Sequence, residues 1–160
     1  IQKDIDNHEL PPFAGSPPAQ LGSKKGGKLK ADQWRVLCTH HLVYTLIRLW
    51  GPFRTSTIPE EVRKYQMLQN YLDLIEAVKL ATSPTQTEAS IQQYEATIER
   101  YLRRLLELYP GTSLVPNHHL AHAHYGPLLR NFGPDHAWRC WAFERYNGIL
   151  KRFKTNKRHG

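Results

Sequence analysis

What the sequence lacks excludes several large classes of protein. It has two cysteines, Cys38 and Cys140, which are too few for a disulfide framework and fit an intracellular protein with reduced thiols. No apolar run approaches the roughly 20 residues that a membrane-spanning helix needs. The first ten residues contain neither an initiating methionine nor the apolar core of a signal peptide. We therefore expect a protein with no membrane partner, and a chain that is one piece of a longer protein.

Positive charge is abundant. The 160 residues, enough for one compact domain with a modest core, carry a formal net charge of +8. Much of it lies in two clusters, Lys24, Lys25, Lys28 and Lys30 near the start and Lys151, Arg152, Lys154, Lys157 and Arg158 at the end. Such clusters favour a polyanionic partner or an anionic surface, although a solvated protein surface accounts for them equally well.

Residues 1–30 have the composition of an extended arm or linker. Prolines and glycines interrupt them among lysines, at Pro11, Pro12, Pro17, Pro18, Gly22, Gly26 and Gly27. Proline removes a backbone donor and restricts its neighbour, while glycine adds conformational freedom. We expect no regular structure before residue 31.

From Ala31 onward the apolar residues recur at helical spacing, and the predicted fold class is all-α, a helical bundle. Helices are expected at 31–50, which ends at Gly51-Pro52, at 58–82 and at 87–109. A poorer helix over 117–131 is interrupted by Gly126-Pro127, and a last one spans 138–153. No segment has a convincing strand pattern, so residues 31–160 are predicted to form one helical domain.

Four histidines within seven residues are candidate metal ligands. His118 and His122 are one α-helical turn apart, whereas His119 and His124 converge if the helix frays near Gly126. Zinc takes about four ligands, and imidazole is its commonest partner. Cys38 and His41, in a C-x-x-H spacing, can supply two more ligands and join the first helix to the fourth. The same histidines can equally be surface or core residues without a metal.

Glu144 lies among aromatic residues, Trp138, Trp141, Phe143 and Tyr146. A buried carboxylate needs a cation, either an arginine such as Arg145 or a divalent metal such as Mg²⁺. An exposed ion pair with Lys151 is the simpler alternative. The basic residues that follow Glu144 are placed either for DNA phosphates or for the favourable end of a helix dipole.

These features together resemble a known family. The block WAFERYNGILKRF, preceded in order by IQKDID, LKADQWR, LVPNHHL and FGPDHAW, resembles the end of the catalytic domain of CACTA-like and Kyakuja–Dileera–Zisupton transposases, which are common in fungal genomes. The resemblance spans most of the chain, and WAFERYNG is its most specific part. It implies a DDE domain with an RNase H-like fold that is interrupted by an all-helical insertion.

A more distant likeness is to the vertebrate antigen-receptor recombinase, in which histidines precede a tryptophan, an E-x-x-N motif and a basic helix. By this resemblance Glu144 is the third catalytic carboxylate, and His119 and His124 belong to a structural zinc site, while the His118/His122 alternative stays open. Asn147, Lys151, Arg152, Lys154, Lys157 and Arg158 would then contact DNA. Cys38 and His41 match an upstream zinc-ligand pair only weakly.

The resemblance also implies what lies outside this chain. Two catalytic aspartates and the sheet of the RNase H-like core are expected upstream of Ile1, and the present chain would be the helical insertion with the final catalytic helix. In the intact nuclear enzyme, which can be a homo-oligomer, three carboxylates would hold two Mg²⁺ or Mn²⁺ ions for DNA strand cleavage and transfer. The chain alone should be inert, and its source element can be active or decayed.

Two other functions compete with this interpretation. The first is a non-catalytic nucleic-acid-binding helical module, or a relic, derived from such an element. The second is a zinc hydrolase built on HHLAHAH, which is disfavoured because the cluster has no H-E-x-x-H arrangement and no adjacent acidic base.

Overall fold

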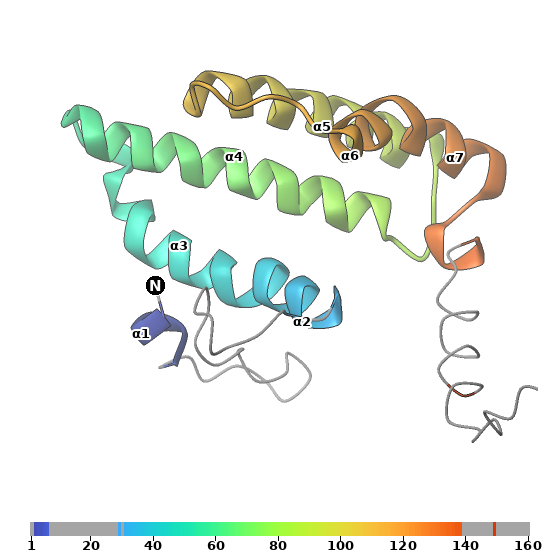
Figure 1. Cartoon of the computed structure of the whole chain (residues 1–160), viewed down its shortest axis with the longest axis horizontal. Coiled ribbons are helices and arrows are strands. Elements are labelled where there is room, and N and C mark those ends of the chain that lie inside the picture. Colours follow the sequence, from blue (N-terminus) through green and yellow to red (C-terminus); the bar gives the residue numbers. More distant parts are fainter. Residues whose placement is uncertain (1, 7–28, 30, 139–148, 150–160) are drawn as a thin grey trace, which may run out of the picture.

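The computed structural model describes residues 2–6, 29, 31–138 and 149, and every regular element in this part of the chain is a helix (Figure 1). The all-α prediction is therefore confirmed for the described residues, which contain no strand. The predicted last helix over 138–153 lies outside them except for its residues 138 and 149.

Two long antiparallel helices form the centre of the molecule. Helix α4 (Pro59–Ala81) begins with proline and two acidic residues in its first turn, and α5 (Glu88–Leu108) begins at a capping box. In this box the Thr87 Oγ1 atom accepts the Ser90 N–H at 3.1 Å, and the Ser90 Oγ atom accepts the Thr87 N–H at 2.9 Å. Both helices lie close to their predicted bounds of 58–82 and 87–109.

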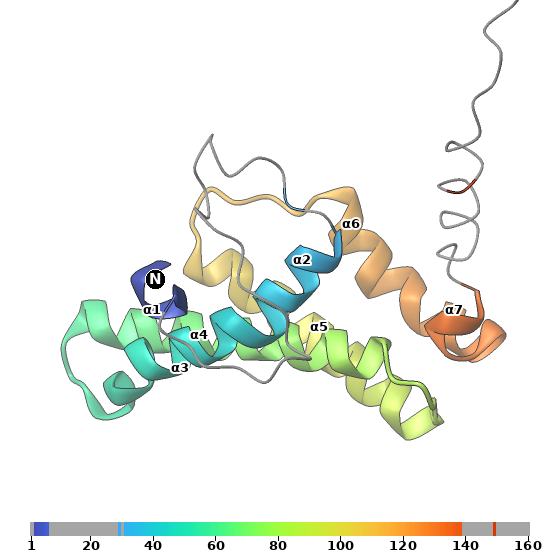
Figure 2. The same cartoon turned by 90° about the horizontal axis from the view of Figure 1, so that it is seen from below.

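The predicted helix at 31–50 is present but is divided by a widened turn. It consists of α2 (Ala31–Val36), the π-helical turn η3 (Leu37–His41) and α3 (Leu42–Trp50), followed by the 3₁₀ turn η4 (Gly51–Thr55). Figures 1 and 2 show α3 on the side of α4 that faces away from α5. Helix α4 therefore has neighbours on two sides and contacts both α3 and α5.

The histidine-rich segment packs on α5. Helix α6 (Pro116–His119), the π-helical turn η5 (Leu120–His124) and α7 (Tyr125–Phe132) follow one another directly. The expected interruption at Gly126-Pro127 is wrong, because α7 runs through both residues. The helix ends at Gly133, whose φ of 74° favours glycine, and the 3₁₀ turn η6 (Asp135–Ala137) follows.

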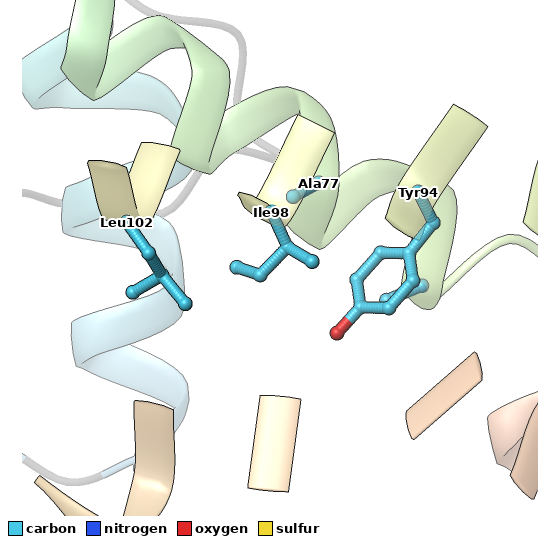
Figure 3. Close-up of a cluster of buried hydrophobic side chains, with 5 residues drawn as sticks. Ala77, Tyr94, Ile98 and Leu102 are labelled. Carbon is cyan, nitrogen blue, oxygen red and sulfur yellow. The ribbon is translucent and has the colours of Figure 1, made fainter. Parts of the chain in front are cut away.

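The main core lies between α4, α5 and the histidine-rich segment. Figure 3 shows Ala77, Tyr94, Ile98 and Leu102 side by side. Ala81 completes this buried cluster, and partly buried side chains from four elements pack against it, namely Leu80, Tyr101, Leu105, Ala121 and Tyr125. Because Ala121 and Tyr125 belong to η5 and α7, the same core that joins α4 to α5 also anchors the histidine-rich segment. We call this segment, from Pro116 to Phe132, the histidine helix.

The expectation that residues 1–30 have no regular structure is wrong for a short part of them. Residues Gln2–Asp6 form helix α1, which contacts α3. A helix this short is not stable alone, and two tertiary contacts account for it. Ile5 is fully buried, and Asp4 forms an ion pair with Arg48 of α3.

We predict that Ile98→Ala lowers the free energy of unfolding by about 2–5 kcal/mol, because it removes a buried side chain and leaves a cavity. Ile98 is 4% exposed. The matched control is Ile47→Ala on α3, where the side chain is 44% exposed, and which should change stability by no more than about 0.5 kcal/mol. Urea denaturation followed by circular dichroism measures both, and equal losses would contradict the assignment of the core.

Candidate metal centre

The four clustered histidines lie on a helix whose middle turn is wider than an α-helical turn. The N–H of Tyr125 donates to the carbonyl of Leu120, five residues earlier. Pro127 has no N–H to give to the carbonyl of Ala123, and its ring crowds that carbonyl in a regular helix. Helices commonly widen or kink next to a proline. In the widened turn, residues five apart come onto the same face of the helix.

This turn brings His119 and His124 together. Their Nε2 atoms are 3.2 Å apart, and the ring centroids are 5.0 Å apart at an interplanar angle of 80°. One ring donates an N–H to the other, and both side chains are exposed. Two Zn–N bonds of 2.0–2.1 Å at a tetrahedral angle hold their nitrogens about 3.3–3.4 Å apart. The spacing of the pair therefore fits two ligands of one zinc ion.

His118 and His122 are placed for other contacts. The Nδ1 atom of His118 accepts the N–H of Val115 at 3.2 Å, which closes the first turn of α6. A ring whose Nδ1 accepts a hydrogen bond carries its proton on Nε2 and offers no free lone pair to a metal. His122 lines a shallow hollow of about 210 Å³ beside Leu102, Leu106 and Leu114. The structure thus favours the His119/His124 register over His118/His122.

Cys38 and His41 lie in the other widened turn, η3. Figure 1 shows η3 on the far side of α4, whereas η5 lies on the α5 side of the bundle. His41 is fully buried, and burial raises the pKa of the Cys38 thiol, although a hydrogen bond with Tyr71 opposes this. Among the described residues, no three His, Cys, Asp or Glu side chains gather as a metal-binding group. The four-ligand zinc site is thus not assembled there, and zinc binding stays a prediction.

Arg130 fastens the histidine helix to α5, a role that no sequence motif indicated. Its guanidinium donates to Glu88 at 2.8–3.2 Å and to Glu95 at 2.6–2.8 Å. These hydrogen bonds are the main reason why the pKa values of Glu88 and Glu95 are lowered. Gly126 permits the close approach, because a Cβ at this position would overlap the Glu95 carboxyl group.

The remaining predicted site residues lie outside the described residues. These are Glu144, Asn147, Lys151, Arg152, Lys154, Lys157 and Arg158. Immediately before them in the chain, Trp138 is tied to α7. Its Nε1–H donates to the Gly133 carbonyl at 3.0 Å, and its ring lies 5.5 Å from that of Tyr125.

Comparison with known proteins identifies no relative. No family model, no curated protein and no solved structure matches this chain. Within the part of the chain that the structure describes, no helix has the length and apolar character that crossing a bilayer requires.

The Arg130 contacts predict a specific acid sensitivity. Since the folded-state pKa of Glu95 lies below its value in the unfolded chain, its stabilising contribution is present above about pH 4.5 and is lost as the pH falls through the lowered value. Arg130→Met should therefore flatten the loss of stability as the pH falls below about 4.5, as measured by urea denaturation at each pH.

Arg103→Met is the matched control, because Arg103 pairs with Glu99 within one helix and should leave the acid dependence nearly unchanged. Parallel pH profiles for wild type and Arg130→Met would contradict the role of this arginine.

Proposed function

We propose that this chain is the C-terminal helical part of the catalytic domain of a CACTA/Kyakuja–Dileera–Zisupton-type DDE transposase, a nuclear enzyme that cuts and joins DNA. The observation that carries the proposal is the order of its sequence blocks, from LKADQWR through LVPNHHL to WAFERYNGILKRF. An all-helical body is consistent with the helical insertion that interrupts the RNase H-like fold of that family.

The histidine pair gives the proposal independent support. By the more distant likeness to the antigen-receptor recombinase, His119 and His124 would belong to a structural zinc site. A regular α-helix does not place residues five apart on one face, yet the Nε2 atoms of this pair are 3.2 Å apart. Zinc at this point would be structural, because it would tie the histidine helix to ligands from elsewhere in the protein.

The distribution of charge also supports a nucleic-acid partner. Residues 31–138 contain ten Lys or Arg and ten Asp or Glu. The net charge of +8 therefore comes from the two ends, with +2 in residues 1–30 and +6 in residues 139–160. Most cations of the helical body are also engaged in ion pairs, as in Arg100 and Arg104 with Asp73. Most of the excess positive charge that could bind DNA phosphates therefore lies close to Glu144 in the sequence.

In the intact enzyme, two Mg²⁺ or Mn²⁺ ions would activate the attacking oxygen and stabilise the leaving oxygen. The contribution of this chain would be the Glu144 carboxylate, a hard oxygen ligand. Lys151, Arg152 and Lys154 would neutralise flanking phosphates and so orient the strand, while Asn147 would contact the DNA next to Glu144.

A DNA-binding test addresses the basic end. Affinity of the chain for duplex DNA should fall with salt, with a slope in log–log form of roughly −0.9 per phosphate contact. Lys151→Ala, Arg152→Ala and Lys154→Ala together should flatten that slope by up to about three contacts. Arg103→Ala is the control, because this exposed cation already pairs with Glu99. No binding at low salt, or an unchanged slope in the triple variant, would refute this assignment.

Glu144→Gln separates the transposase from its main rival, a non-catalytic DNA-binding module. Glutamine keeps the shape of the side chain but is a much poorer ligand for a hard cation. In an enzyme reconstructed with its upstream region, the change should abolish strand cleavage while DNA affinity stays within about twofold, since the interaction matters mainly in the transition state. Cleavage at the parental rate would remove Glu144 from the active site and leave the binding module as the better interpretation.

A further inference from the structure

The two widened turns share a feature that lies outside the family resemblance. In η3 the N–H of Leu42 donates to the carbonyl of Leu37, and in η5 the N–H of Tyr125 donates to the carbonyl of Leu120. In both turns the carbonyl of the second residue accepts a tyrosine hydroxyl from a long helix. The Tyr71 hydroxyl of α4 donates to Cys38 at 2.6 Å, and the Tyr94 hydroxyl of α5 donates to Ala121 at 2.6 Å.

A simple count of backbone hydrogen bonds explains why a hydroxyl is needed. When one amide donates five residues back and the following amides resume the four-residue pattern, one carbonyl inside the turn is skipped. A carbonyl that is shielded from water and left without a donor costs free energy. Each tyrosine hydroxyl supplies that donor. In a regular α-helix the carbonyl would have its own amide partner, so the hydroxyl favours the widened turn over the α-helical alternative.

Both hydroxyls are suited to this task. Each hydroxyl can donate at neutral pH, because the tyrosine hydroxyl keeps its proton there. The Tyr94 ring is 3% exposed and lies 5.6 Å from the Tyr125 ring at the end of η5. The hydroxyl is therefore held against the turn by the same core that joins α4, α5 and α7.

The turns coincide with the candidate ligands. The sequences LCTHH and LAHAH both begin with leucine and end with histidine, and between them they contain Cys38, His41 and His124. Next to η5, His119 reaches His124 only because the turn between them is widened. If the turn closed to α-helical spacing, His124 would rotate by about 100° around the helix axis relative to His119, and the 3.2 Å contact would be lost.

We propose that Tyr94 is the positioning residue of the histidine pair, and that Tyr71 does the same for Cys38 and His41, each by donating its hydroxyl to the skipped carbonyl of a π-helical turn. The part that concerns metal binding rests on the proposed zinc site. The part that concerns the turn does not, because it depends only on backbone and hydroxyl contacts.

The test is Tyr94→Phe, which removes the hydroxyl and keeps the ring in the core. Two measurements are made on the whole chain. NMR follows both amide exchange at Tyr125 and the ring contact between His119 and His124. Protection of Tyr125 should fall by roughly 2- to 10-fold if the turn stays wide without its donor, as expected for one hydrogen bond, and the ring contact should be lost if the turn closes to α-helical spacing. Titration with Zn²⁺ alone measures affinity, which should fall by roughly 10–100-fold, as when other supporting groups of metal ligands are removed.

Tyr101→Phe is the matched control, because Tyr101 packs against the same core but takes part in neither of the two hydroxyl–carbonyl hydrogen bonds. It should change neither the exchange of Tyr125 nor the Zn²⁺ affinity. Tyr71→Phe is the reciprocal variant and should speed exchange at Leu42 while leaving Tyr125 unaffected. If circular dichroism shows that Tyr94→Phe does not fold, exchange at Leu42 in Tyr71→Phe tests the role of the tyrosine hydroxyl instead.

The outcomes test the positioning role of Tyr94 and the binding of zinc separately. If Tyr94→Phe folds with unchanged exchange at Tyr125 and with ring contacts between His119 and His124 still visible by NMR, the positioning role is refuted. If the parent chain binds no Zn²⁺, or binds it equally well as His119→Ala/His124→Ala, the zinc site of the proposed function is refuted, and the exchange data still test the turn.

Discussion

The position of the candidate ligands His119 and His124 depends on how α5 lies along α4. A single carboxylate on α4 sets that register. Asp73 accepts from Arg100 at 2.9 and 3.1 Å and from Arg104 at 3.0 Å. Arg63 of α4 also donates to the carbonyl of Leu108 at the end of α5, at 2.8 Å. Although Asp73 is only 13% exposed, both arginines are more than 40% exposed. Ion pairs that are open to solvent contribute only about 0–1 kcal/mol each, so they select the register while the buried apolar cluster supplies the stability.

The position of the histidine helix depends on that register, because the helix is held by groups on α5. Its own buried surface is small, with only Gly126 and Leu129 buried between 116 and 132. Three groups on α5 compensate for this. Glu88 and Glu95 hold Arg130, and Tyr94 donates to Ala121. These groups lie at positions 88, 95 and 94, about two helical turns in all, so a slip of α5 by one turn would remove all of these contacts at once.

The sequence was sufficient for the larger elements. Apolar spacing predicted α4 and α5 to within one residue at each end, because helical periodicity is a local property of the sequence. Helix α1 was missed because Ile5 and Asp4 are held by contacts with a distant part of the chain. The short helix has no local signal of its own.

The geometry of the candidate site was less predictable. Sequence reasoning left the pairs His118/His122 and His119/His124 both open, and assumed that Gly126-Pro127 would break the helix. A π-helical turn changes the spacing of one face from four residues to five. Whether such a turn forms depends on a donor for the skipped carbonyl, and that donor, Tyr94, is 27 residues away from Ala121. The choice of register is therefore a tertiary property, and periodicity along the histidine segment alone does not determine it.

The distribution of charge along the chain affects how DNA would bind, in a way that the net charge alone does not indicate. A helical body with equal numbers of cations and anions in residues 31–138 offers weak long-range attraction to a polyanion, and cations that already bind carboxylates must break those pairs before they can bind phosphate. An excess of +6 in residues 139–160 instead concentrates the attraction within a few residues of Glu144. If DNA binds through these residues, its phosphates contact cations that are close in sequence to Glu144, the one carboxylate that the family resemblance makes catalytic. A uniformly basic body would bind DNA in many orientations, most of them unproductive. Cations next to Glu144 in the sequence would instead favour binding close to that residue, as the proposed function requires.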